Sequence, residues 1–445
     1  MRRWSRAAKA HYHVSREVAD RLNGAGHLAL FAGGCVRDIR LDREPKDFDI
    51  ATAATPEEVQ ALFPKTRAVG AHFGVVLVRI RGLDVEVATF RRDGPYEDGR
   101  RPTHVVYATA REDAARRDFT INGLFLNPAT GEVIDHVDGE RDLAAGRIRA
   151  IGDPSQRFGE DYLRMLRALR FASSLGFEIG PGTWRALQGM APRIAGISPE
   201  RIRDELSRML TVPGRRRAVE MLVDSGLAEV VLPELLALRG CEQPPQFHPE
   251  GDVFVHTMIM LEGLADEAPL ELVWAVLLHD IGKPVTQTVD DDGRIRFNGH
   301  DAVGAEMARG ILTRLRYPNR VIEAVVTMVG RHMQFMHVQQ MRTSRLKRFM
   351  AEPTFEQECE LHRVDCESSH GKLDNLDFLR RRRHEFESEP LVPPPLVSGH
   401  DLIALGWKPG PEFKGVLEEA QNLQLEGQLS DRRQALEWLR RRTAR

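Results

Sequence analysis

The hydrophobic pattern of this chain changes character at about Asp153. Before that point, short runs alternate apolar and polar residues, as half-buried strands do, and turn residues separate them. The expected strands are Leu28–Ala32, Asp47–Thr52, Gly74–Ile80 and Leu83–Thr89, and the expected helices are Val36–Leu41 and Pro56–Phe63. After it, helical periodicity takes over. The sequence therefore predicts an α+β fold, in which an N-terminal domain with a small mixed sheet precedes all-helical domains.

The composition is that of an ordinary globular protein, with 29% charged and 42% hydrophobic residues and a net charge of −2. The four cysteines form no Cys-x-x-Cys pattern, which fits a reducing compartment. The longest apolar run, Leu272–Leu278, is far too short to span a bilayer, and no apolar run follows the basic start of the chain. We therefore expect a cytoplasmic protein with no membrane partner.

Asp47-Phe48-Asp49 places two carboxylates in a segment that we expect to be a strand. Side chains two apart on a strand face the same way, so both carboxylates converge on one point. They repel each other there unless a cation lies between them. Hard oxygen ligands near the Gly33-Gly34 turn suit Mg²⁺ bound to a polyphosphate. Asp84 or Glu86, on a later strand, could complete the set. A solvated strand face would explain Asp84 equally well, but it explains Glu86 less well.

Two further clusters suit a nucleoside triphosphate. Gly34 lies between a strand and a helix, where backbone N–H groups approach a phosphate, and Arg37 follows it. Arg117 can grip phosphate oxygens through its forked donors. Asp118 and Asn122 lie four apart at the start of an expected helix, on one face, where they could hold a ribose. Taken alone, that segment could equally be a helix start with a capping Asp.

A third cluster lies on a helix expected from Glu160 to about Leu175. Asp161, Arg164 and Arg167 follow one polar edge of it. Without further context, a surface ion pair explains them best.

Four motifs stand in the order seen in bacterial class II tRNA nucleotidyltransferases and poly(A) polymerases, and they occupy residues 33–38, 47–50, 85–91 and 116–122. The chain resembles a CCA-adding enzyme of that family. The resemblance implies a nucleotidyltransferase head with Asp47, Asp49 and Glu86 as catalytic metal ligands, which favours Glu86 over Asp84. It implies Mg²⁺ there, CTP and ATP as nucleotides, and the 3′ end and acceptor arm of tRNA as the RNA partner.

The same resemblance implies that Asp161 and Arg164 select the incoming base. Cytosine and adenine both offer an amino group beside an acceptor ring nitrogen. A carboxylate can accept from the amino group and a guanidinium can donate to the nitrogen, whereas uracil and guanine reverse both groups. The segment Val69–Gly74 lacks the two basic residues that poly(A) polymerases of this class carry there, which favours CCA addition. Poly(A) addition, and an enzyme that adds only CC or only A, stay open as alternatives.

A second constellation follows between residues 248 and 370. His256, His279, Asp280 and Asp365 stand in an order that resembles the HD-superfamily phosphohydrolases, with Leu277–Lys283 around the central pair. The resemblance implies that these four bind a divalent metal and that His300 and His332 could hold a second one. In CCA-adding enzymes with this domain, the implied activities are phosphatase and 2′,3′-cyclic phosphodiesterase, which would repair damaged tRNA 3′ ends.

The resemblance reaches the C-terminal segment Ser398–Gly406 and thus covers nearly the whole chain. We expect a nucleotidyltransferase head, a helical neck for base selection and RNA binding, an HD domain and a helical tail, at residues 1–152, 153–235, 236–395 and 396–445. Functions of other classes would be an HD nucleotide hydrolase whose head only binds nucleotides, and a non-catalytic RNA-binding protein. An intact set of Asp47, Asp49 and Glu86 speaks against both.

Overall fold

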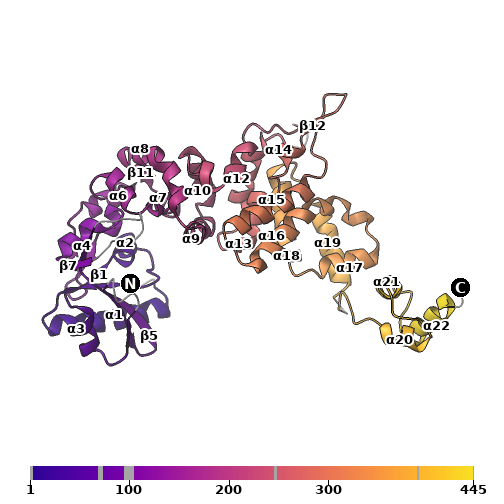
Figure 1. The fold of residues 1–445 in the computed structure, drawn as a ribbon, viewed down its shortest axis with the longest axis horizontal. Coiled ribbons are helices and arrows are strands. Elements are labelled where there is room, and N and C mark those ends of the chain that lie inside the picture. The colour runs from indigo at the N-terminus through magenta and orange to yellow at the C-terminus, as the bar shows by residue number, and fades with distance from the viewer. Residues whose placement is uncertain (1–3, 69–73, 95–104, 245–247, 388–389, 444–445) are drawn as a thin grey trace. The chain divides into compact units, whose positions relative to one another are not determined.

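The computed structural model describes residues 4–68, 74–94, 105–244, 248–387 and 390–443. Most of the segment Val69–Gly74, on which the choice between CCA and poly(A) addition depends, therefore lies outside the described residues. The chain divides into two compact units, Met1–Leu236 and Ala237–Arg445, which Figure 1 colours from indigo to magenta and from pink to yellow.

The first unit is built on a mixed sheet, which has seven strands among the described residues, in the order β3-β4-β5-β2-β1-β8-β9. Strands β2 and β5 run parallel, and the other neighbours run antiparallel. The strands are β1 (Ala29–Ala32), β2 (Ile50–Thr52), β3 (Thr66–Ala68), β4 (Val75–Ile80), β5 (Leu83–Thr89), β8 (Phe125–Leu126) and β9 (Val133–Ile134). A separate pair consists of β6 (Arg91–Asp93) and β7 (Val105–Tyr107). The predicted mixed sheet is thus confirmed.

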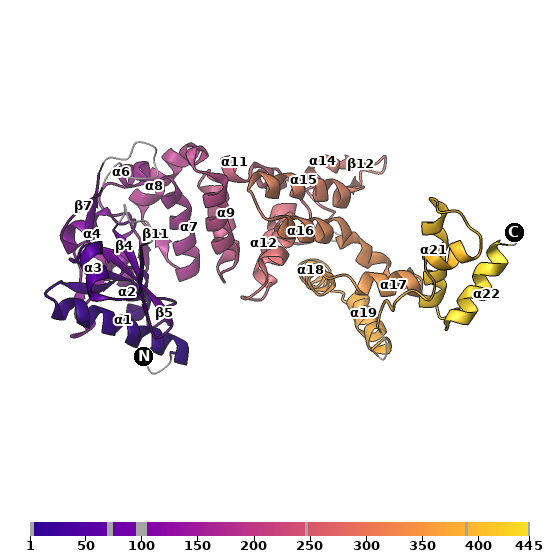
Figure 2. The ribbon, with the colours of Figure 1, turned by 60° about the horizontal axis from the view of Figure 1, so that its bottom comes forward.

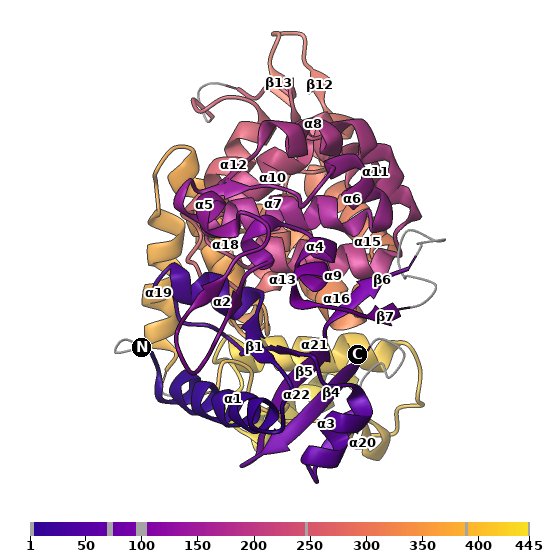
Figure 3. The same ribbon diagram turned by 90° about the vertical axis from the view of Figure 1, so that its left-hand side faces the viewer.

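Helices α1 and α3 pack against this sheet, as Figure 3 shows. After the sheet comes a helical part with one short strand pair, β10 (Arg147–Ile148) and β11 (Glu178–Ile179), and α7 and α9 lie side by side in it (Figure 2). The helices of the unit are α1 (Arg6–Gly24), α2 (Gly34–Arg40), α3 (Pro56–Leu62), α4 (Ala110–Arg116), η2 (Thr120–Asn122), α5 (Gly139–Ala144), α6 (Pro154–Glu160), α7 (Leu163–Leu175), α8 (Pro181–Met190), η3 (Ala191–Gly196), α9 (Pro199–Leu210), α10 (Arg215–Asp224) and α11 (Ala228–Val231). The 3₁₀ helix η4 (Pro233–Leu238) crosses the boundary between the units.

The structure corrects two of the expected elements. Strand β2 begins at Ile50, so Asp47-Phe48-Asp49 precedes it. Asp49 still accepts a backbone hydrogen bond at 3.0 Å from Ala32, the last residue of β1, and Asp47 and Phe48 lie beyond the end of that strand. The single helix expected from Glu160 is two helices, because the backbone is extended at Asp161 (φ −154°, ψ 104°). Glu160 therefore ends α6, and α7 begins at Leu163.

The second unit is mainly helical (Figure 1). Its helix α13 is buried from Leu272 to Leu278, because other helices surround it and an all-apolar sequence can face them on every side. The elements are α12 (Val253–Gly263), α13 (Leu270–Leu278), α14 (Lys283–Thr286), β12 (Thr288–Val289), β13 (Ile295–Arg296), α15 (His300–Arg314), α16 (Asn319–Arg331), η5 (His332–Gln340), α17 (Thr343–Met350), α18 (Phe355–Ser368), α19 (Asp374–Glu385), α20 (Gly399–Ala404), α21 (Glu412–Leu425) and α22 (Arg432–Thr443). Within the described ranges, no helix has both the length and the apolarity to cross a bilayer.

Candidate functional sites

The first unit contains a polar pocket with a volume of about 810 Å³, here called the first site. It brings together the metal and nucleotide residues expected from the sequence, namely Gly34, Arg37, Asp47, Asp49, Glu86, Arg117, Asp118, Asn122, Asp161, Arg164 and Arg167. Asp84 lies elsewhere on β5, where it is exposed and pairs with Arg79 at 3.8 Å.

Phe48 positions the two aspartates of the first site. Its ring is buried and lies 5.6 Å from the ring of Phe31 and 5.5 Å from that of Tyr12, measured between centroids. In extended backbone the neighbouring side chains point away from such an anchor, so Asp47 and Asp49 face the pocket. Strand β5 pairs with β2 through Val87 opposite Ile50, and this register brings Glu86 beside Asp49.

The three carboxylates act on one another electrostatically. Burial, the charge of Asp47 and the charge of Glu86 raise the pKa of Asp49 to about 7, while Arg117 works in the opposite direction. Partial burial and the Asp47 charge also raise the pKa of Glu86. Mutual repulsion of this kind is relieved by a cation, so the donor set fits Mg²⁺.

A chain of hydrogen bonds forms the next wall of the first site. Arg37 donates to Asn122 at 2.8 Å, Asn122 donates to Asp118 at 3.0 Å, and Arg167 donates twice to Asp118 at 2.6 and 2.8 Å. Asp118 and Asn122 thus face each other as expected, but the helix expected there is only the short η2, which begins after Asp118. Burial alone would raise the pKa of Asp118, yet the Arg167 charge and these hydrogen bonds lower it to about 2.

Arg117 depends on a residue that sequence reasoning missed. Asp113 is buried and accepts two hydrogen bonds from Arg117, at 2.9 and 3.1 Å, which direct the guanidinium along the pocket wall. A Cβ at Gly33, which has φ +70°, would come within 2.9 Å of that guanidinium. Glycine is therefore needed at Gly33 both for the left-handed turn and for the approach of Arg117. The only sequence signal for Asp113 was its spacing of four residues from Arg117.

Asp161 and Arg164 both line the first site but are not bound to each other. Arg201 on α9 donates to Asp161 at 2.6 Å, whereas Arg164 pairs with Glu160. The sequence placed Asp161 and Arg164 on one helix edge, and the break at Asp161 turns them toward different partners. Arg201 was missed because it is distant in the sequence, and only the packing of α9 against α7 brings it there.

The second unit gathers the predicted His and Asp residues into one group, called the His–Asp cluster, in which Asp365 is half-buried and the other members are buried. It consists of His256, His279, Asp280, His300, His332 and Asp365, which come from or adjoin α12, α13, α15, η5 and α18. His256 lies 3.1 Å from Asp365, and His300 lies 3.3 Å from Asp280 and 3.1 Å from His332. Two triads, His256–His279–Asp280 and Asp280–His300–His332, have ligand atoms within 4.8 Å.

The donors of the His–Asp cluster fit a divalent cation. The Nε2 atoms of His256 and His279 are buried and have no hydrogen-bond partner in the described part of the chain, although each lies 3.1 Å from a carboxylate oxygen. Burial opposes the charge on His256, but the neighbouring carboxylates of Asp365 and Glu250 raise its pKa to about 9. A cation would take the place of the protons that hold these nitrogens and oxygens together.

Two neighbours of the cluster were missed from the sequence. The Nδ1 of His256 lies 2.6 Å from the Glu250 carboxylate, which therefore accepts its hydrogen and leaves Nε2 facing the cluster. Lys283 is buried and lies 2.6 Å from Asp280. Lys283 stands in the quoted motif Leu277–Lys283, but nothing in the sequence pattern singled out Glu250.

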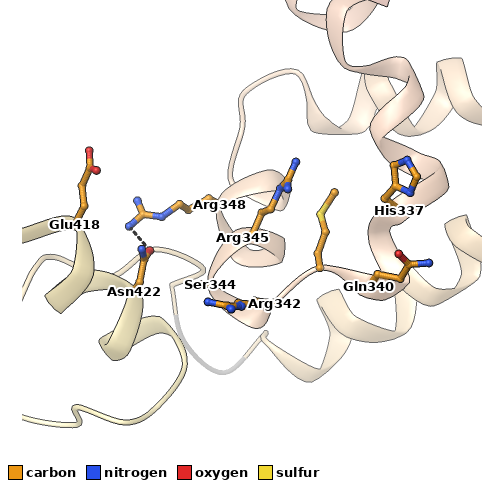
Figure 4. A pocket seen from close by; sticks show the side chains of 9 residues that line it. His337, Gln340, Arg342, Ser344, Arg345, Arg348, Glu418 and Asn422 are labelled. Atoms are coloured by element: carbon orange, nitrogen blue, oxygen red, sulfur yellow. Dashed lines mark hydrogen bonds between the residues drawn. The ribbon is translucent and has the colours of Figure 1, made fainter. Parts of the chain in front are cut away.

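A separate cavity of about 700 Å³ in the second unit lies between α17 and α21, and Figure 4 shows the side chains around it. Arg342, Arg345 and Arg348, which recur every three residues, line it. Arg348 donates to Asn422 at 3.2 Å, and Glu418 is the acidic residue of the lining. We call this the arginine pocket.

Comparisons with known proteins match three spans of the chain to domain families. Residues 29–149 match the family model described as poly A polymerase head domain, and residues 176–238 match the probable RNA and SrmB-binding site of polymerase A. Residues 252–357 match the HD domain, a span that ends before Asp365. These spans carry the head and RNA-binding domains of the poly(A) polymerase family, followed by an HD domain. The expected family and α+β fold are thereby confirmed.

The similar curated proteins and solved structures described next are all named CCA-adding enzymes. CCA-adding enzymes of Lactobacillus gasseri and Bacillus pumilus are 46% and 41% identical over 215 and 262 residues, which is 48% and 59% of this chain and 54% and 61% of theirs. The matched region thus spans only about half to three fifths of these curated relatives. The crystal structure of the Bacillus stearothermophilus CCA-adding enzyme with CTP is similar over 97% of this chain and 98% of that chain, with a TM-score of 0.76 and 28% identity. A Thermotoga maritima CCA-adding enzyme shares the fold, with a TM-score of 0.59 and 18% identity over 97% of this chain and 95% of that one.

Proposed function

We propose that this chain is a tRNA nucleotidyltransferase that adds C, C and A to tRNA 3′ ends from CTP and ATP, without a nucleic-acid template. The observation that carries the proposal is the first site, where Asp47, Asp49 and Glu86 face a wall of arginines in one pocket. Similar chains that are named CCA-adding enzymes, one of them solved with CTP, support it.

In this proposal each part of the first site has a separate task. Asp47, Asp49 and Glu86 hold Mg²⁺, which when bound lowers the pKa of the attacking 3′ hydroxyl and offsets charge on the triphosphate. Arg37 and Arg117 bind the triphosphate oxygens beside the N-terminus of α2 at Gly34. Asp118 and Asn122 hold the ribose, and Arg167 fixes Asp118. The tRNA hydroxyl attacks the α-phosphorus and the bond to pyrophosphate breaks, which releases the pyrophosphate.

Base selection follows from Asp161 and Arg164. The carboxylate accepts from the amino group of cytosine or adenine, and the guanidinium donates to the adjacent ring nitrogen. Arg201 pairs with Asp161 and Glu160 pairs with Arg164, so both groups are held in place. The carboxylate keeps further lone pairs and the guanidinium keeps further N–H groups, which can meet the base edge.

The test is an incubation of the purified chain with Mg²⁺, a tRNA that ends before CCA, and each nucleotide alone or all four together. Sequencing of the products should show C, C, A and then a stop. A long tail of A would instead make the chain a poly(A) polymerase, and addition that stops after CC or adds only A would mark a partial enzyme. Asp49→Asn should lose addition, whereas Asp84→Asn, on the same strand but outside the pocket, should keep it.

We further propose a phosphohydrolase activity for the His–Asp cluster, which would remove terminal phosphates or open 2′,3′-cyclic phosphates at damaged tRNA ends. His256, His279, Asp280 and Asp365 hold a divalent cation, with His300 and His332 beside it; such a cation, when bound, activates water. The water oxygen bonds to phosphorus, one phosphorus–ribose oxygen bond breaks, and that oxygen gains the proton. Asp280→Asn should abolish hydrolysis of a 2′,3′-cyclic end but leave nucleotide addition intact. Loss of both activities in a folded variant would contradict two separate sites.

The arginine pocket supports tRNA as the partner. Arg342, Arg345 and Arg348 present three guanidiniums to one cavity of the second unit (Figure 4). Guanidiniums in such a row bind successive phosphates of a nucleic-acid backbone and do not read the sequence.

A further inference from the structure

A cavity of about 610 Å³ adjoins the His–Asp cluster. Asp280, His300, His332 and Asp365 line one end of it. These four residues account for a cation and the phosphate that it would contact. Part of the remaining wall is basic, with Lys283, Arg296 and Lys372, and suits a phosphate as well. Another part is apolar, and neither a cation nor a phosphate explains it.

One side of the cavity is the 3₁₀ helix η5. Such a helix has 3.0 residues per turn, so side chains three apart are eclipsed and form rows. One row is buried and consists of His332, Phe335 and Val338. The next row lines the cavity and consists of Met333, Met336 and Gln339. Met336 is 60% exposed there.

Phe297 joins the apolar surface to the charged end. Its carbonyl oxygen accepts a hydrogen bond from Nδ1 of His300 at 2.8 Å. The Nζ of Lys283 lies 5.4 Å from the Phe297 ring centroid and 2.6 Å from Asp280. Phe297 lines the same cavity as the methionines and the His–Asp cluster. The apolar wall and the charged end are therefore parts of one continuous cavity.

The methionine row ends at a pair of amides. Gln339 donates from Nε2 to the side-chain oxygen of Asn375 at 2.9 Å, and both residues line the cavity. An amide pair offers a further acceptor and further donors besides this bond. A flat apolar ligand on the methionines would thus meet hydrogen-bonding groups at its far edge.

We propose that this cavity is a nucleoside subsite, in which a nucleobase lies on Met333 and Met336 with its edge toward Gln339 and Asn375. The ribose then lies near Phe297, and the phosphate reaches the His–Asp cluster. The inference rests on the phosphohydrolase function proposed for the same cluster. The ligand chemistry is a nucleobase joined through ribose to a phosphate, which an RNA 3′ end and a free nucleotide share.

Binding is tested in the full chain labelled at its methionine methyl groups, with chelator present so that nothing turns over. Adenosine 3′-monophosphate should shift the Met333 and Met336 methyl signals upfield, because a base ring lies over them, and Met→Leu variants assign the two signals. Ribose 5-phosphate, which has no base, should leave both in place. Equal shifts with the two ligands, or none with the nucleotide, overturn the subsite.

Kinetics give a second test. Met336→Ala should raise the KM for adenosine 2′,3′-cyclic phosphate roughly tenfold through lost apolar contact, with little change in kcat. The effect should be confined to substrates that carry a base, so glycerol 1,2-cyclic phosphate serves as the comparison. Met336→Leu keeps an apolar side chain of similar volume, so its KM should stay close to that of the parent chain. Val289→Ala, which removes an apolar side chain that is 63% exposed outside the cavity, is the control and should match the parent chain.

The outcomes separate the two proposals. If the parent chain hydrolyses neither substrate, the phosphohydrolase function fails, and the methyl shifts still decide whether the subsite exists. If both substrates are hydrolysed and Met336→Ala affects them equally, the subsite is wrong while the function stands. A short RNA with a 2′,3′-cyclic end, run beside the mononucleotide, shows which source the cavity prefers. Insensitivity of both to Met336→Ala counts against the subsite.

Discussion

Arg201 on α9 donates a hydrogen bond of 2.6 Å to the carboxylate of Asp161 in the extended residue between α6 and α7. The pair joins two elements that are forty residues apart in the chain. It fixes the direction of the carboxylate that we propose as an acceptor for the amino group of the base. Arg201 is thus a positioning residue in this proposal.

Replacement of Arg201 by Gln should loosen base selection more than it slows addition. Without the ion pair, Asp161 can turn away from the base edge, so the preference for CTP over UTP should fall about tenfold, within the range of one base contact. The measurement is kcat/KM for each nucleotide on a tRNA that lacks CCA. Arg203→Gln changes a neighbour on α9 that pairs with Asp204 at 2.7 Å, and serves as the matched control. An unchanged preference for CTP over UTP in Arg201→Gln would show that Arg201 does not position Asp161 for base selection.

Glu250 should strengthen metal binding by the His–Asp cluster, although it is not a member of the cluster. Its carboxylate fixes the Nδ1 hydrogen of His256, and loss of such a partner weakens metal binding by about tenfold to a hundredfold. We expect Glu250→Gln to lower Co²⁺ affinity by that amount and to alter the visible spectrum of the bound ion. Glu267→Gln, an exposed change in the same unit, should do neither. An identical spectrum and affinity in Glu250→Gln would show that His256 needs no such partner.

Asp118 should make the first unit sensitive to acid. Its folded-state pKa of about 2 lies below the ordinary value of 3.8, so the ionised form is favoured by folding. The resulting stabilisation, about 2 kcal/mol, is present above pH ~4 and is lost as the pH falls toward ~2. Urea unfolding should therefore show a gap between the parent chain and Asp118→Asn that narrows between pH 5 and pH ~2. Asp20→Asn, at an exposed ion pair with Arg16, should show no such change; a constant gap for Asp118→Asn would contradict the assignment.

The arginine pocket should contribute to tRNA affinity in a salt-dependent way. Each lost phosphate contact lowers the slope of log affinity against log salt concentration by about one unit. Arg345→Glu should therefore weaken binding of tRNA at low salt and flatten that slope. Arg381→Glu makes the same charge change at an exposed site on α19, outside the pocket. Equal effects of the two variants on tRNA binding would show that only the net charge of the chain matters, and not the arginine pocket.

Much of the fold could be predicted because its signals are local. The alternation in Leu83–Thr89 marks β5, and Pro56 with the capping Thr55 marks the start of α3. The wrong predictions concern segments whose structure depends on the elements that pack beside them. Asp47-Phe48-Asp49 has the pattern of a strand, but β1 ends at Ala32, which reaches the backbone of Asp49 and leaves Asp47 and Phe48 beyond its end.

The sequence by itself determined which chemical groups are present and in what order, because motifs such as Asp47–Asp49 and His279–Asp280 combine carboxylates and imidazoles at short spacing. Only the tertiary structure decided which groups face one another. Arg201 reaches Asp161 through helix packing, Glu250 reaches His256 from the segment before α12, and the row of Met333 and Met336 exists because η5 is a 3₁₀ helix. Contacts between residues distant in the chain depend on how elements pack, and no local pattern encodes that.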